Sequence, residues 1–200
     1  MGLRAIIFDI DGVLADSSKA VVHNTETLLR EFGFPFEHES VLKMSRAHSA
    51  DTVLLSLAPE LEQDGAKLKA MLKRLSELTQ ENMGLITPLP LAPHIPKIAA
   101  RYLLAAATNR KGSAGPVLER LGVRQYFPVV MTSADAKAKP APDMVVMALA
   151  KLGVKANEAM FVGDNEEDMQ AGRAAGTKTL MLDGSDSGAC GKFLKEIGIA

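Results

Sequence analysis

The apolar residues of this chain recur with two different spacings, and the spacing changes near residue 87. Between residues 16 and 86 they recur every three or four positions, which is the spacing of one face of a helix. Stripes of this kind cover residues 22–32 and 68–78. The sequence therefore predicts helices in this part of the chain, with a further helical region at about 39–57 that is interrupted near its middle, and it shows no convincing strand.

Short apolar runs alternate with helical stripes after residue 87, and one such run also opens the chain. Strands that alternate with helices form a parallel sheet with helices on both faces. We therefore expect an α/β fold with a doubly wound, Rossmann-like parallel sheet, formed by residues 1–15 and 87–200, and an all-helical domain of residues 16–86 inserted after the first strand. The predicted strands are residues 4–8, 102–107, 129–132, 159–162 and 179–182, and the predicted helices between and after them are residues 113–121, 143–152, 167–175 and a last helix at the C-terminus.

Composition limits the partners and the cellular compartment that can be expected for this protein. The 200 residues include 23 basic and 24 acidic side chains without a basic run, so nucleic acid is not expected as a partner. The single cysteine, Cys190, excludes an internal disulfide framework and suits a reducing compartment. The first apolar run is too short for a signal peptide or a membrane span, so we expect a cytoplasmic protein with no membrane partner. The composition leaves monomer and dimer equally open.

Polar residues follow the predicted strands, at the edge where open parallel sheets bind ligands. Asp9 and Asp11 come directly after the first strand, where two carboxylates repel each other and lose hydration. Such a pair requires a nearby cation or a chemical role. The other strands are followed by Thr108, Asn109 and Arg110, by Lys139 in the next loop, and by Gly163 and Asp164, with Asp168 four residues further on. Each group alone is typical of a turn or a helix cap, but four groups on one edge favour an active site.

Four segments at these strand ends occur in the order FDIDGVLAD, ATN, KPAPD and VGDNEEDMQAG. In this order they resemble the motifs of the haloacid dehalogenase-like hydrolase superfamily, and the resemblance covers nearly the whole chain. It points to the phosphatase branch that carries a helical cap after the first strand, the branch of phosphoglycolate phosphatases and β-phosphoglucomutase. Residues 16–86 would then be the cap, and residues 1–15 and 87–200 the core. Dehalogenating members lack the second acid, Asp11, so carbon–halogen cleavage is not expected.

The resemblance implies a role for both acids of the first motif. Asp9 would be the nucleophile and form an aspartyl-phosphate. Asp11 would be the general acid that protonates the leaving group and then the base that activates water. A Mg²⁺ ion would relieve the repulsion between the acids, since Mg²⁺ prefers oxygen ligands. Its ligands would be Asp9, the backbone carbonyl of Asp11, Asp164 and Asp168, the last directly or through water.

The resemblance also implies a substrate, a small phosphorylated metabolite. Thr108, the backbone of Asn109 and Lys139 would hold the phosphoryl oxygens, and Lys139 would compensate the charge of the transferring group. In the cap, Arg46 and His48 lie between predicted helical segments, where either could contact a substrate anion. A cap of this kind would close over the site and select the substrate.

Two alternatives to a phosphatase stay open at this point. A phosphomutase of the β-phosphoglucomutase type would use the same nucleophile, and the segment LKMSRAHS at 42–49 resembles the mutase segment that places an arginine over the phosphate. However, mutases usually have glutamate where this chain has Gly163, and their cap histidine would fall near Val21; both departures favour a hydrolase. The other alternative is a binding or regulatory module that kept the fold without catalysis.

Overall fold

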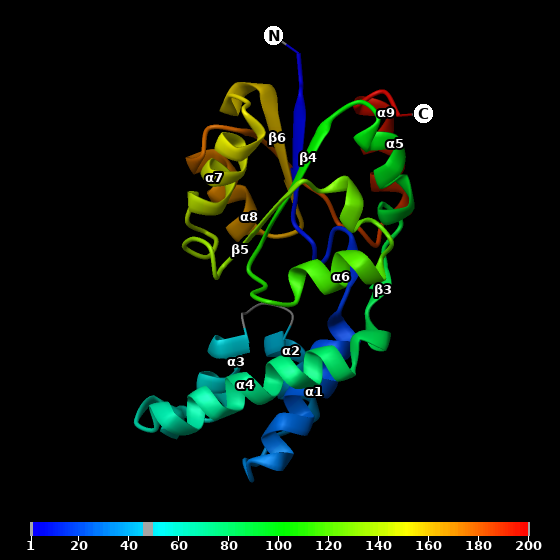
Figure 1. The fold of residues 1–200 in the computed structure, drawn as a ribbon. Coiled ribbons are helices and arrows are strands. Elements are labelled where there is room, and N and C mark those ends of the chain that lie inside the picture. Colours follow the sequence, from blue (N-terminus) through cyan, green and yellow to red (C-terminus); the bar gives the residue numbers. More distant parts are fainter. Residues whose placement is uncertain (1, 46–49, 200) are drawn as a thin grey trace. The chain divides into compact units, whose positions relative to one another are not determined.

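The computed structural model describes residues 2–45 and 50–199, and the chain divides into two compact units (Figure 1). The α/β unit consists of Met1–Asp16 and Thr87–Ala200, and the helical unit consists of Ser17–Ile86. Among the described residues, no helix has the length and apolar character needed to cross a membrane.

A parallel sheet of five strands forms the centre of the α/β unit. The strand order is β5-β4-β1-β6-β7, so β1 lies in the middle with β4 and β6 at its sides. All four residues of β1 are buried, and its continuous run of apolar residues is typical of a strand covered on both faces. The parallel sheet predicted from the sequence is thereby confirmed. Its strands are β1 (Ala5–Phe8), β4 (Leu103–Thr108), β5 (Val129–Thr132), β6 (Ala159–Gly163) and β7 (Lys178–Met181).

Helices cover both faces of this sheet. Ile7 belongs to an apolar cluster with Val145 of α7 and Ala171 of α8. The next side chain, Phe8, makes an edge-to-face contact with Phe193 of α9, with 6.3 Å between the ring centroids. Because successive side chains of a strand point to opposite faces, α9 covers the face opposite to α7 and α8, and the predicted doubly wound arrangement is confirmed. The helices are α5 (Ile95–Ala99), α6 (Ala114–Arg120), α7 (Asp143–Leu152), α8 (Glu166–Ala174) and α9 (Ser187–Glu196).

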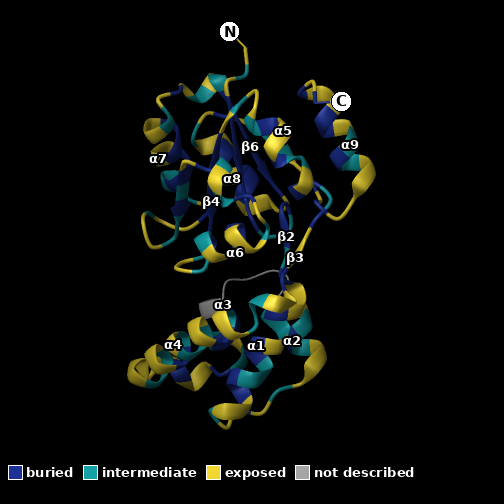
Figure 2. Cartoon of the chain, turned by 45° about the vertical axis from the view of Figure 1, so that its right-hand side comes forward, coloured by how far each residue is buried: buried dark blue, intermediate teal, exposed yellow. Residues whose placement is uncertain are grey.

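The helical unit is held together by the apolar stripes that the sequence shows. Leu28, Met71 and Leu78 are among the buried residues of its core, and the outer faces of its helices are exposed (Figure 2). Asp64 caps the last helix, because its Oδ1 accepts a hydrogen bond of 2.9 Å from the backbone N–H of Lys67. The helices are α1 (Ser18–Glu31), α2 (His38–Ser45), α3 (Ala50–Leu57) and α4 (Gly65–Glu81).

A two-stranded antiparallel ribbon is one element that the sequence did not predict. It pairs β2 (Ala15–Asp16) with β3 (Thr87–Pro88), where the chain leaves and re-enters the α/β unit. Two residues are too few for an alternating pattern to be read, so this pairing leaves no periodic signal. Short 3₁₀ helices complete the structure at Pro59–Glu62 (η1), Met83–Leu85 (η2), Ala92–His94 (η3), Arg124–Tyr126 (η4) and Ala156–Glu158 (η5).

Candidate active site

The predicted site residues of the α/β unit follow the carboxyl ends of its central strands. Asp9 comes directly after β1, Thr108 is the last residue of β4, and Asp164 comes directly after β6. The backbone N–H of Asp9 donates a hydrogen bond of 2.9 Å to the carbonyl of Val162 in β6, which fixes the start of the loop to the neighbouring strand. Since these three strands are neighbours in the sheet, residues separated by up to 155 positions come to one edge.

A buried lysine joins two of the acids. The Nζ atom of Lys139 lies 2.9 Å from Oδ1 of Asp9 and 2.5 Å from Oδ1 of Asp168. The three side chains are 3%, 6% and 0% exposed. The other oxygen of Asp168 accepts hydrogen bonds from the backbone N–H groups of Asp164 (3.1 Å) and Asn165 (3.4 Å). Asp168 therefore holds both the lysine and the loop that follows β6.

The side chain of Asn109 positions Lys139. Its Oδ1 accepts a hydrogen bond of 2.8 Å from the backbone N–H of Lys139, and its Nδ2 donates one of 3.3 Å to the carbonyl of the same residue. The hydroxyl of Ser133 donates to the carbonyl of Asn109 (2.8 Å), so the asparagine is itself fixed. The sequence analysis assigned a role only to the backbone of Asn109; its side chain adds a clamp on the lysine loop.

Burial and crowding shift the pKa values of the acidic residues. Burial raises the pKa of Asp9 to about 7; Lys139 opposes this increase, and Asp168 and Asp11 add to it. Burial and then Asp168 raise the pKa of Asp164 to about 6. Burial alone would lower the pKa of Lys139, but Asp9 and Asp168 outweigh it and raise that pKa. The cluster therefore contains more negative charge than its lysine neutralises.

The acidic cluster fits a divalent cation. Asp9, Asp164 and Asp168 each offer a carboxylate oxygen, and these oxygens lie within 4.8 Å of one another. Oδ1 of Asp9 is buried and accepts no hydrogen bond of ordinary geometry from the residues that the structure describes, although Lys139 is close to it. A buried carboxylate oxygen without such a bond is poorly solvated. Three hard oxygen donors and an excess of negative charge suit Mg²⁺ or a similar ion.

Two glycines allow the backbone to approach the acids closely. A Cβ atom on Gly12, whose φ is +74°, would lie 1.9 Å from Oδ2 of Asp164. A Cβ atom on Gly163 would lie 2.2 Å from the Cβ of Asp168. The mutase pattern has glutamate at the second of these positions, and this backbone has no space for that side chain without displacing Asp168.

Arg110 is the neighbour of Asp11, a pairing that sequence analysis did not assign. Its Nε donates a hydrogen bond to Oδ2 of Asp11 and its Nη2 donates one to Oδ1, and each bond is 2.7 Å long. Burial alone would lower the pKa of Arg110, but Asp11 and then Asp9 raise it, so the guanidinium stays charged. The only signal in the sequence was the position of Arg110 directly after the second predicted strand.

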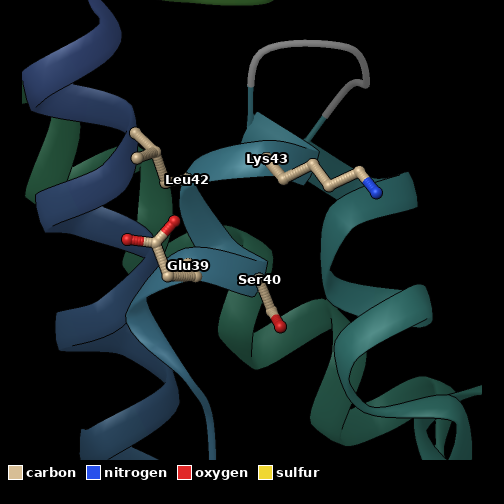
Figure 3. Close-up of a pocket in the computed structure, with 4 residues that line it drawn as sticks. All are labelled: Glu39, Ser40, Leu42 and Lys43. Carbon is tan, nitrogen blue, oxygen red and sulfur yellow. The ribbon is translucent and has the colours of Figure 1, made fainter.

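The helical unit contains a cavity of about 420 Å³ on α2, lined by Glu39, Ser40, Leu42 and Lys43 (Figure 3). Figure 3 shows the Lys43 side chain extending away from α2, with Ser40 one turn earlier in the helix. Arg46 and His48, the residues predicted to contact substrate from the cap, lie outside the described residues. Their predicted role stays a prediction.

The fold and the acidic cluster together define the class of protein. Residues 6–182 match the family model of haloacid dehalogenase-like hydrolases, so the chain belongs to this family, as the resemblance of its motifs predicted. The chain is a phosphoric monoester hydrolase of this family. Members generally use a divalent metal ion, which agrees with the donor set of the acidic cluster.

Individual relatives agree with this class. The chain is 27% identical to the pyrophosphatase PpaX of Oceanobacillus iheyensis, over 91% of this chain and 84% of the relative. It is 30% identical to a phosphoglycolate phosphatase of Yersinia pseudotuberculosis, over 90% of this chain and 81% of the relative. A solved structure of a haloacid dehalogenase superfamily hydrolase of subfamily IA from Geobacter sulfurreducens is 25% identical with a TM-score of 0.71, covering 90% of this chain and 86% of that chain.

Proposed function

We propose that this protein is a Mg²⁺-dependent phosphatase that hydrolyses a small phosphorylated metabolite through an aspartyl-phosphate on Asp9. The observation that carries the proposal is the environment of Asp9. Its carboxylate is buried, it lies 2.9 Å from Lys139, and its Oδ1 accepts no ordinary hydrogen bond from the described residues. Since a poorly solvated carboxylate next to a cation is suited to attack an electrophile, this environment supports Asp9 as the nucleophile.

The reaction would proceed in two displacements. In the first, a carboxylate oxygen of Asp9 forms a bond to phosphorus, the ester P–O bond breaks, and the leaving alkoxide takes a proton from Asp11. In the second, a water molecule attacks the phosphorus and gives a proton to Asp11, while the bond between Asp9 and phosphorus breaks. Inorganic phosphate leaves, and both aspartates return to their starting states.

Residues around Asp9 would hold the phosphoryl group. Lys139 would compensate the negative charge of the phosphoryl oxygens, and Thr108, a buried residue at the end of β4, would donate a hydrogen bond to one of them. The metal ligands would be Asp9, the backbone carbonyl of Asp11, Asp164 and Asp168. A bound divalent cation would neutralise the repulsion among these acids and stabilise the charge that develops on phosphorus.

The substrate class rests on the relatives. Two of them are named as a phosphoglycolate phosphatase and a pyrophosphatase. Small anionic phosphate compounds are therefore the first substrates to test. The test measures release of inorganic phosphate from phosphoglycolate, sugar phosphates, nucleoside monophosphates and pyrophosphate, with Mg²⁺ and with EDTA.

The variant Asp9→Asn is measured alongside the parent protein. Release that depends on Mg²⁺ and disappears in Asp9→Asn supports the proposal. Release that persists in Asp9→Asn contradicts the assignment of the nucleophile. If the folded parent protein releases no phosphate from any of these compounds, the proposed substrate class is wrong.

A further inference from the structure

Arg110 and Asp11 form a two-pronged ion pair across 99 positions of the chain. Both hydrogen bonds are 2.7 Å long, one to each oxygen of the carboxylate. A planar guanidinium that binds both oxygens fixes the plane of a carboxylate as well as its position, which a single contact does not do. The pair therefore restricts the rotation of the Asp11 side chain.

The guanidinium is itself held in place. Its Nη1 donates to the hydroxyl of Ser113 (3.1 Å), and the Arg110 side chain is only 11% exposed. The backbone of Arg110 is fixed as well, because its N–H donates to the hydroxyl of Thr108 (3.3 Å) and its carbonyl accepts from Ser133 (3.2 Å). Arg110 thus connects Asp11 to the rigid end of β4.

The pair leaves the carboxylate able to transfer a proton. A carboxylate has about four lone-pair sites, and the contacts with Arg110 use one site on each oxygen. The Asp11 side chain is 36% exposed, so the arginine does not enclose it. On the backbone side, the N–H of Gly12 donates to the carbonyl of Ala15 (3.0 Å) in a tight turn. The ion pair therefore holds the carboxylate, the turn fixes the backbone that follows Asp11, and part of the side chain stays exposed.

We propose that Arg110 is the positioning residue of Asp11, which it holds in the orientation needed to protonate the leaving group and later to take a proton from water. The inference rests on the proposed function, in which Asp11 is the general acid and base. Proton transfer requires a hydrogen-bond distance and a suitable direction between the two atoms. Without its arginine, Asp11 rotates among several orientations, and only a fraction of them is productive.

A double-mutant cycle tests whether Arg110 acts through Asp11. On an alkyl phosphate such as phosphoglycolate, Arg110→Gln alone is expected to lower kcat by about 10- to 100-fold, a part of the typical contribution of a general acid. In protein that already carries Asp11→Asn, Arg110→Gln is expected to lower the residual rate by less than about 3-fold. If the two losses multiply, Arg110 acts independently of Asp11 and the inference is wrong.

The leaving group gives a second, independent test. p-Nitrophenolate is stable enough to leave without a proton, whereas an alkoxide needs one. In rapid mixing, Arg110→Gln is expected to change the first turnover of p-nitrophenyl phosphate by less than about 3-fold while the alkyl phosphate slows by at least about 10-fold. An equal loss on both substrates would mean that Arg110 acts on the phosphoryl group or on folding, which contradicts the inference. An unchanged rate on both would mean that Arg110 has no role in catalysis.

Three controls complete the test. Arg110→Lys keeps the charge but loses the two-pronged contact, so it is expected to restore only part of the loss. Arg74→Gln breaks a comparable pair with Glu31, whose bonds are 2.9 and 3.0 Å, and is expected to leave the ratio of the two substrates unchanged. Inhibition by inorganic phosphate is expected to stay within about 3-fold of the parent in Arg110→Gln, since Lys139 is retained.

Turnover that survives Asp9→Asn would refute the proposed function, whereas multiplying losses in the cycle would refute only the role of Arg110.

Discussion

One basic side chain contacts several carboxylates in each unit, but the two clusters differ in burial. In the α/β unit, Lys139 lies against Asp9 and Asp168, and these three side chains are at most 6% exposed. In the helical unit, Arg74 lies against three glutamates, and these four side chains are at least 28% exposed. The glutamates are Glu31, Glu77 and Glu81.

The difference in burial reverses the net pKa shift of the carboxyl group, although the cation lowers the pKa of its partner in both clusters. Hydrogen bonds from Arg74 lower the pKa of Glu31 below its ordinary value. Burial raises the pKa of Asp9 to about 7 although Lys139 opposes the shift. A buried charge loses hydration that one ion pair restores only in part, whereas an exposed charge keeps its water. The acids of the exposed cluster therefore stay hydrated, whereas the buried cluster holds negative charge that its lysine does not fully neutralise.

The largest expected contrast between the clusters is in catalysis. Asp9→Asn is expected to lower turnover by about 10³-fold or more, because the nucleophile is lost. Its matched change in the exposed cluster, Glu31→Gln, removes one carboxylate from the same kind of contact. That variant is expected to keep turnover within about 2-fold of the parent, as typical of a surface substitution. Phosphate release measures both variants, and a comparable loss in Glu31→Gln would mean that burial does not separate the two clusters.

The next contrast is in stability. Lys139→Met leaves Asp9 and Asp168 buried without their cation, which is expected to destabilise the metal-free fold by about 3 kcal/mol at pH 8. The loss is expected to be smaller at pH 5, because Asp9, whose pKa is already raised, then takes up a proton. Arg74→Met is expected to shift the unfolding midpoint much less at either pH. Denaturant unfolding in EDTA measures these differences, and equal losses at pH 8 and pH 5 would contradict the explanation.

The third contrast is the response to Mg²⁺ and pH. The folded-state pKa values of Asp9 and Asp164 rise from 3.8 to about 7 and about 6. Between pH 4 and about 7 the folded state therefore binds more protons than the unfolded state, and these two groups make the metal-free fold less stable as the pH rises. Mg²⁺ competes with the same protons.

The increase in Tm on adding Mg²⁺ is therefore expected to be larger at pH 8 than at pH 5. Asp9→Asn is expected to reduce this increase at pH 8, and Glu31→Gln is expected to leave it unchanged. Thermal unfolding with Mg²⁺ and with EDTA supplies the measurement. A Mg²⁺ effect that is the same at both pH values would show that these carboxylates are not its ligands.

The fold could be predicted well from the sequence because its signals are local. Apolar runs of four to six residues gave the strands of the sheet, and helical stripes gave α1 and α4. The fold class then followed from the alternation of these elements. The ribbon β2–β3 could not be predicted, because two residues on each side carry no period and the pairing joins residues about 72 positions apart.

The sequence predicted the residues of the candidate site but not all of the contacts between them. The sequence placed Asp9, Lys139 and Asp168 on one edge, and the structure joins them in one cluster. The pairing of Arg110 with Asp11 depends on rotamers and on the distance between two strand ends, neither of which a pattern along the chain contains. The catalytic and metal-binding roles of these residues stay predictions.

The smallest expected contrast compares two glycines with nearly the same backbone. Gly12 in the α/β unit and Gly33 in the helical unit have φ values of +74° and +76°. An alanine at either position meets the left-handed conformation, which costs about 1 kcal/mol. At Gly33 the added Cβ would have nothing within 4 Å, whereas at Gly12 it would lie 1.9 Å from Oδ2 of Asp164.

Gly33→Ala is therefore expected to lower stability by about 1 kcal/mol and to leave turnover and the Mg²⁺ response unchanged. Gly12→Ala is expected to lower stability further and to weaken the Mg²⁺ response, because Asp164 must move away from the acidic cluster. Denaturant unfolding and Mg²⁺ titration of the two variants measure this difference. If both variants lose stability equally and bind Mg²⁺ like the parent, then the close approach of Gly12 to Asp164 does not define the metal site. If only Gly12→Ala loses its response, the glycine is required because Asp164 occupies the space that a Cβ would fill.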